Sequence, residues 1–122
     1  MFFQSFGFKH GTPVDADYIF DVRCLTNPHW QPEFWPITGE NPVIIDFLQK
    51  NEDVEEMVQQ LGGFLTHWLP MFEAEIQSYL AVGVGCTGGR HRLVYIVNRL
   101  VTTFRDRGQP VQWRHRNLSR LS

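Results

Sequence analysis

The residues best suited to chemistry lie in one glycine-rich segment, residues 82–92. Its sequence is Val-Gly-Val-Gly-Cys-Thr-Gly-Gly-Arg-His-Arg, an apolar run that leads into small residues and then into positive charge. Glycines let the backbone approach a ligand closely, and a loop that opens a helix directs several N–H groups at one point. We therefore predict an anion site, in which Thr87 adds a hydroxyl and the arginines add charge. The alternative is that the glycines only form a tight turn between a strand and a helix.

The elements around this segment have to position it. Residues 79–84 form a continuous apolar run, which is typical of a strand buried on both faces of a parallel sheet. Apolar residues between 93 and 104 recur at helical spacing, and Gly108 with Pro110 ends the predicted helix. The glycine-rich segment therefore connects a buried strand to an amphipathic helix, at the edge of an open sheet where ligands of α/β proteins bind.

The rest of the chain supplies further strands and helices. Residues 2–8 predict an opening strand and Val111 with Trp113 a last one, whereas residues 13–23 are ambiguous between a helix and a strand. Asn41-Pro42 is a typical helix start, followed by an apolar face that begins at Val43. A second helix has apolar residues at helical spacing from 54 to 72. We predict an α/β domain with a small, mostly parallel sheet.

Residues 24–40 lack any periodicity but contain three prolines, Trp30, Phe34 and Trp35. Prolines stiffen a segment and aromatic side chains anchor it, so we predict an ordered loop over one edge of the fold. An aromatic residue in a small domain is more often core than ligand contact, and we predict a core position for Trp113 and plain packing for His67. For Trp30, beside His29, packing and stacking on a ligand are equally expected.

Charge is distributed very unevenly. Residues 1–85 carry three basic and twelve acidic side chains, whereas residues 86–122 carry eight arginines and one acidic residue. This asymmetry favours an anionic partner for the C-terminal third, such as phosphate, nucleic acid or an acidic protein. A basic, exposed helix face that binds nothing is the alternative.

The composition indicates the class of protein. A chain of 122 residues with 43% hydrophobic and 20% charged side chains is long enough for one globular domain. No apolar run reaches membrane-spanning length, and two cysteines are too few for a disulfide scaffold. We therefore expect a cytoplasmic protein. His10, His29 and His91 lack the spacing of a metal site, and we expect no resident cofactor.

The segment Cys86–Arg92 resembles the phosphate-binding loop of cysteine-dependent phosphatases, Cys-x-x-Gly-x-x-Arg. In those enzymes the thiolate attacks phosphorus and the arginine holds the phosphoryl oxygens. Two positions depart from that pattern: Gly85 replaces the usual histidine, and Leu93 replaces the usual serine or threonine. A phosphatase that uses Cys86 is therefore the alternative enzymatic interpretation.

A second resemblance covers nearly the whole chain. The segments Ser-Phe-Gly-Phe-Lys-His-Gly (5–11), Asp-Ala-Asp-Tyr-Ile-Phe-Asp-Val-Arg (15–23), Asn-Pro-His-Trp (27–30), Gly-Cys-Thr-Gly-Gly-Arg-His-Arg (85–92) and Arg-His-Arg (114–116) resemble the C-terminal domain of the RapZ family of RNase adapters. The resemblance implies a phosphofructokinase-like α/β subdomain that spans residues 1–122. In that family an N-terminal P-loop domain precedes it, and that domain is not among the 122 residues.

The resemblance also implies ligands and partners. It implies binding of glucosamine-6-phosphate and of small regulatory RNA, which the family presents to an endoribonuclease; we further expect a homo-oligomer. The implied sugar-phosphate pocket comprises His10, Asp21, His29, Cys86, Thr87, Gly88 and Arg92. We add Gly89, which belongs to the same turn. The basic residues expected to contact RNA are Lys9, Arg90, Arg114, His115, Arg116 and Arg120. The family's lysine-rich tail is replaced here by Asn-Leu-Ser-Arg-Leu-Ser, which bears on RNA affinity.

One carboxylate is a candidate for ligand selectivity. Asp21 could accept a hydrogen bond from a ligand amine or orient His29. A carboxylate that faces the amino group of an amino sugar would discriminate against the acetylated form, which cannot carry the charge. For Asp15 and Asp17, capping or surface roles are the more expected alternative.

Overall fold

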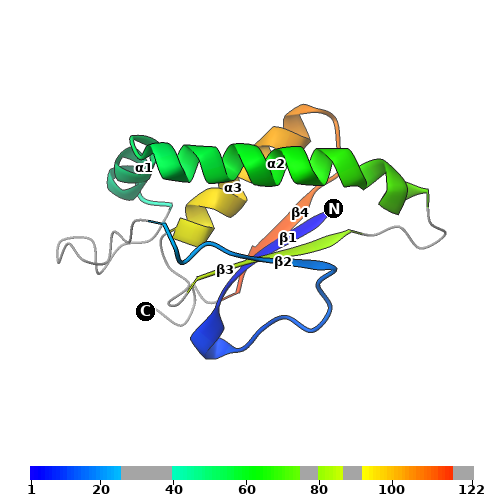
Figure 1. Ribbon diagram of the computed structural model, residues 1–122, viewed down its shortest axis with the longest axis horizontal. Helices are drawn as coiled ribbons and strands as arrows, with labels where there is room; N and C mark the ends of the chain where they lie inside the picture. The colour runs from blue at the N-terminus through cyan, green and yellow to red at the C-terminus, as the bar shows by residue number, and fades with distance from the viewer. Residues whose placement is uncertain (26–39, 75–79, 87–91, 117–122) are drawn as a thin grey trace.

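Four parallel strands form one sheet in the order β2-β3-β1-β4 (Figure 1). The computed structural model describes residues 1–25, 40–74, 80–86 and 92–116. The strands are β1 (Phe2–Gly7), β2 (Tyr18–Asp21), β3 (Ala81–Cys86) and β4 (Gln112–His115). The predicted α/β class with a small parallel sheet is confirmed, and the ambiguous segment 13–23 contains an edge strand.

The helices begin and end where local residues dictate. They are η1 (Phe8–His10, a 3-10 turn), α1 (Pro42–Gln49), α2 (Glu52–Glu73) and α3 (Arg92–Asp106). The Asn41 side chain accepts a hydrogen bond of 2.9 Å from the N–H of Val43, which confirms the predicted start of α1. Gly108 has a φ of 83°, a left-handed conformation that suits glycine just after a helix end. In the described segments, no helix is sufficiently long and apolar to cross a membrane.

The connections place the helices on one face of the sheet. The β1-to-β2 connection crosses the sheet in the direction opposite to the β2-to-β3 and β3-to-β4 connections. Crossovers between parallel strands are right-handed in nearly all proteins, so connections that run in opposite directions lie on opposite faces. Figure 1 accordingly shows α1, α2 and α3 above the sheet, and the η1 segment below it.

The main core fills the space between the sheet and the helices. Phe3 of β1 is fully buried and its ring lies 6.0 Å from that of Phe104 in α3. All six residues of β3 are buried, as expected for an interior parallel strand, and Val82, Val84 and Cys86 contribute to this core.

The opposite face is covered by aromatic rings that rest on glycines of β3. Phe6 is fully buried and packs edge-to-face against Phe8, with ring centroids 4.9 Å apart. A Cβ atom at Gly85 would lie 2.6 Å from Phe6 and 2.8 Å from Phe8, and one at Gly83 would lie 3.2 Å from Phe6. A side chain at position 85 would therefore collide with these rings, which explains why the histidine of the phosphatase pattern does not fit here.

Some predicted positions differ in the structure. Trp113 is 44% exposed, so its predicted core position is wrong; Val43, on the predicted apolar face of α1, is 54% exposed. The reason for Trp113 is that β4 is the outermost strand of the sheet. His67 is also exposed and contacts Trp68 on the surface of α2. Most of the predicted ordered loop, with Trp30, Phe34 and Trp35, lies outside the described residues.

Candidate functional site

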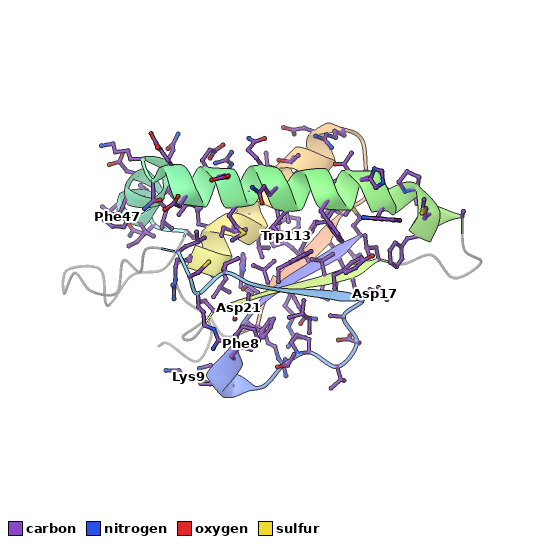
Figure 2. All side chains as sticks on the ribbon, in the orientation of Figure 1. Phe8, Lys9, Asp17, Asp21, Phe47 and Trp113 are labelled. Carbon is purple, nitrogen blue, oxygen red and sulfur yellow. The ribbon has the colours of Figure 1, made fainter. Side chains whose placement is uncertain are left out.

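The carboxyl ends of all four strands meet at one edge of the sheet, because the strands are parallel. The residues that follow the strands therefore converge: Lys9 and His10 after β1, Arg23 after β2, and Arg116 after β4. Figure 2 shows Phe8, Lys9 and Asp21 together at this edge, while Asp17 lies at the other end of β2. Ligands of open α/β sheets bind at this edge.

Asp21 and Arg23 form an ion pair at the end of β2. Asp21 accepts a hydrogen bond of 3.0 Å from the backbone N–H of Arg23, and its other oxygen lies 2.6 Å from Arg23 Nε. The guanidinium carbon of Arg23 lies 5.1 Å from the centre of the Phe8 ring, a cation–π geometry. This chain of contacts connects the exit of β2 to the exit of β1.

Arg92, the first residue of α3, is a buried cation at the same edge. Only 5% of the surface of Arg92 is exposed to solvent. Its Nη1 donates to the carbonyl oxygens of Arg23 at 2.7 Å and Leu25 at 2.8 Å. Among the described residues, no carboxylate forms an ion pair with it. Arg92 therefore fixes the segment after β2 to the start of α3, and its charge is not neutralised by any described acid.

Cys86 closes β3 but belongs to the hydrophobic core. It is 3% exposed and packs in the cluster between the sheet and the helices. A nucleophilic cysteine needs a partly accessible, electropositive environment. The burial of Cys86 therefore disfavours nucleophilic attack by its thiol.

His115 is held by two hydrogen bonds rather than exposed. The hydroxyl of Ser5, a fully buried residue, donates to Nδ1 over 2.8 Å, and Nε2 donates to Asn98 Oδ1 over 2.8 Å. Burial lowers the pKa of His115 below its usual 6.5, and the charge of Glu40 opposes this shift. His115 thus connects β1, β4 and α3 through its ring, and the RNA contact expected for it from the sequence stays a prediction.

The other basic residues separate into two groups. Lys9 and Arg114 are exposed, and Arg116 Nη1 donates to the carbonyl of Gly11 over 3.3 Å, which brings the end of β4 to the segment after η1. Arg99 instead forms a bidentate pair with Glu55 at 2.7 and 2.8 Å and also donates to the Tyr95 hydroxyl. Arg99 therefore connects α3 to α2.

Several predicted site residues have no description in the structure. His29, Thr87, Gly88, Gly89, Arg90 and Arg120 lie outside the described residues. Four residues of the predicted pocket lie at the same edge of the sheet: His10, Asp21 and Cys86 end η1, β2 and β3, and Arg92 begins α3. The side chain of Cys86, however, faces the core. In the described part of the chain no three metal-ligating side chains cluster.

Arg23 is the residue that sequence reasoning missed. The sequence showed it only as one of few basic residues in the acidic part of the chain. Its spacing of two from Asp21 was the available signal, because alternate residues of an extended segment share a face. The structure adds the contact with Phe8, which no sequence pattern indicates.

Comparisons with known proteins agree with this picture. The family model described as the RapZ C-terminal domain matches residues 1–119. Proteins named RNase adapter protein RapZ from Yersinia pseudotuberculosis, Yersinia pestis and Yersinia enterocolitica are 52% identical to this chain over 120 residues. The match covers 98% of this chain but 42% of each relative, so the chain spans less than half the length of these relatives. The chain belongs to the RapZ C-terminal domain family.

Proposed function

We propose that this domain binds glucosamine-6-phosphate at the carboxyl edge of its sheet and binds RNA through its basic surface. In this role it acts as a regulatory adapter that presents RNA to an endoribonuclease. The relatives named RNase adapter protein support the adapter part of the proposal. The substrates and partners follow from the family resemblance together with the features of the edge.

The observation that carries the sugar-phosphate proposal is the buried guanidinium of Arg92. A buried charge is costly unless it is paired, and no described carboxylate neutralises this one. Arg92 also opens α3, where the positive end of the helix dipole favours an anion. A phosphate group placed at this helix start would supply the missing negative charge.

Asp21 supports the choice of an amino sugar. Its side chain is 35% exposed and shares its charge with Arg23, so it can also accept from a ligand ammonium group. A glucosamine amino group carries that charge, whereas an N-acetylated sugar does not. The pair Asp21–Arg23 thus offers both signs of charge beside the proposed phosphate position.

The RNA proposal depends on the other basic residues at the sheet edge. Arg116 contacts Gly11, in the segment after η1, while Lys9 of η1 and Arg114 of β4 are exposed, and arginine and lysine supply most phosphate contacts. The endoribonuclease partner, a homo-oligomeric state and a cytoplasmic location are further parts of this proposal. Sedimentation of the purified chain, with and without RNA, tests the oligomeric state.

The experiment for the sugar-phosphate site is a thermal unfolding series. Glucosamine-6-phosphate at about a hundred times its dissociation constant adds roughly 2.7 kcal/mol to the free energy of unfolding. That corresponds to a rise in melting temperature of several degrees for a domain of this size. Glucosamine and N-acetylglucosamine-6-phosphate are the matched controls, because each lacks one of the two charges, and both should give smaller shifts.

Two variants separate binding from phosphatase chemistry. Cys86→Ser should keep the ligand-induced shift, because the thiol is part of the core. Arg92→Lys keeps the charge but loses the two-carbonyl geometry, and should reduce the shift. Release of inorganic phosphate by the unsubstituted chain that Cys86→Ser abolishes would contradict the adapter proposal.

A further inference from the structure

Trp113 is an exposed aromatic side chain on an open strand edge. It lies in β4, the outermost strand of the sheet, and is 44% exposed. Its register partner in β1 is Phe3, which faces the helices. The Trp113 ring therefore lies on the face of the sheet that the helices cover (Figure 2). A large apolar side chain of this size gains little stability when it is left nearly half exposed.

One cationic side chain lies over this ring. The guanidinium carbon of Arg105, in the last turn of α3, lies 5.4 Å from the centre of the Trp113 ring. Arg114 follows Trp113 on the same strand and is exposed, but successive residues of a strand point to opposite faces, so Arg114 lies on the face of β4 away from the helices. Arg107 points elsewhere, because its Nη1 donates to the Thr66 hydroxyl over 2.6 Å. Asp106 is the acidic residue next to Arg105 in the sequence. Arg105 and Arg114 place one positive charge on each face of the outermost strand β4.

Trp68, the other exposed tryptophan among the described residues, has a different environment. It is 36% exposed on α2 and lies beside Phe64 and His67. The first turn of α2 carries acidic residues, and its last turn has no basic one. Among the described residues no guanidinium lies over the Trp68 ring, so Trp68 has similar exposure to Trp113 but a different charge environment, and it provides a matched control.

We propose that Trp113, with Arg105 on its ring, is a stacking platform for an unpaired base of single-stranded RNA. Stacking on an aromatic ring and neutralisation of the adjoining phosphates are the two ways in which proteins hold single strands. Trp113 supplies the first. Arg105, on the same face, and Arg114, on the opposite face of this outermost strand, supply the second. This inference rests on the proposed RNA binding and specifies where on the domain a base is held.

A purely structural cation–π pair is the competing explanation, and the two differ in what they predict. A structural pair at an exposed site stabilises the fold by about 0.5–1 kcal/mol and has no effect on RNA. A stacking platform contributes to RNA affinity without contributing to its salt dependence, because stacking releases no counterions. The dependence of affinity on salt therefore separates Trp113 from the arginines.

The test is a fluorescence anisotropy titration of the full chain with labelled oligouridine of about 12 nucleotides. Trp113→Ala should weaken binding about 5- to 140-fold with an unchanged slope of log affinity against log salt. Trp113→Phe should retain most of the affinity, because a phenyl ring also stacks, and Trp68→Ala should bind as the unsubstituted chain does. Arg114→Ala should flatten the slope by about 0.7.

The outcomes distinguish this inference from the proposed function. If the unsubstituted chain binds no oligouridine, the RNA proposal and the platform both fail. If it binds and Trp113→Ala binds equally well, only the platform is overturned, and Trp113 then serves the fold or a protein partner. Equal loss in Trp113→Ala and Trp68→Ala would overturn it as well. Duplex RNA is the control ligand, because its bases cannot unstack onto a ring. The Trp113→Ala variant and the unsubstituted chain should bind duplex RNA with equal affinity.

Discussion

Substitution of Gly85 by alanine tests whether the rings of Phe6 and Phe8 pack closely on β3 near its carboxyl end. The new Cβ would lie 2.6 Å from Cζ and 2.9 Å from Cε2 of Phe6, and 2.8 Å from Cε2 of Phe8. Phe6 is fully buried, whereas Phe8 is only half-buried. Overpacking of a filled core costs about 1–3 kcal/mol, so the free energy of unfolding should fall by that amount.

The controls for Gly85→Ala come from the other glycines. A Cβ at Gly83 would lie 3.2 Å from Phe6, a milder approach, so Gly83→Ala should cost less than Gly85→Ala. Gly63 lies in the interior of α2 with no atom within 4 Å of its Cβ position, so Gly63→Ala should stabilise the chain by about 0.5–1 kcal/mol.

Chemical denaturation at 25 °C measures all three variants. The expected order of stability is Gly63→Ala above the unsubstituted chain, then Gly83→Ala, then Gly85→Ala. Phe8→Ala should relieve part of the clash, so the double variant with Gly85→Ala should be less destabilised than the sum of the two single changes. If Gly85→Ala has the stability of the unsubstituted chain, the packing of Phe6 and Phe8 on β3 is refuted.

Two further predictions concern titratable groups. The hydrogen bond from Arg99 lowers the pKa of Glu55, so the pair stabilises the fold above the usual pKa of glutamate and this contribution is lost as the pH falls through the lowered value. Glu55→Gln should reduce the free energy of unfolding by about 0.5–1 kcal/mol at neutral pH, measured by denaturation, and should have no effect at a pH where Glu55 is protonated. Burial lowers the pKa of His115 below 6.5, so the unfolded chain takes up this proton first and stability falls as the pH drops below 6.5. His115→Gln should flatten the dependence of melting temperature on pH in that range, and an unchanged profile would contradict the half-buried neutral ring.

Patterns within short stretches of sequence predicted much of the fold. The side chain of Asn41 and the ring of Pro42 determine the start of α1 within a few residues of sequence. The apolar run of β3 needed no tertiary information, because an interior parallel strand is buried on both faces. The class of the fold followed from the alternation of these elements.

The remainder depended on contacts between distant parts of the chain. Trp113 alternates with polar neighbours as a strand should, but its exposure follows from the position of β4 at the sheet edge. The carbonyl group of Arg23 that Arg92 binds lies 69 positions away in the sequence. Local sequence therefore indicated that Arg92 opens a helix at an anion site, but not that it also holds the exit of β2. The edge strand β2 is short, which left residues 13–23 ambiguous.

Calorimetric titration of the chain with glucosamine-6-phosphate measures the proposed site itself. We predict saturable binding with one ligand per chain, weaker binding of glucosamine and of N-acetylglucosamine-6-phosphate, and unchanged affinity in Cys86→Ser. Each missing charge removes one of the two electrostatic contacts offered by Arg92 at the start of α3 and by Asp21 at the end of β2. No saturable heat at millimolar ligand, or equal affinity for glucosamine and its 6-phosphate, would contradict the assignment of a sugar-phosphate site to this edge.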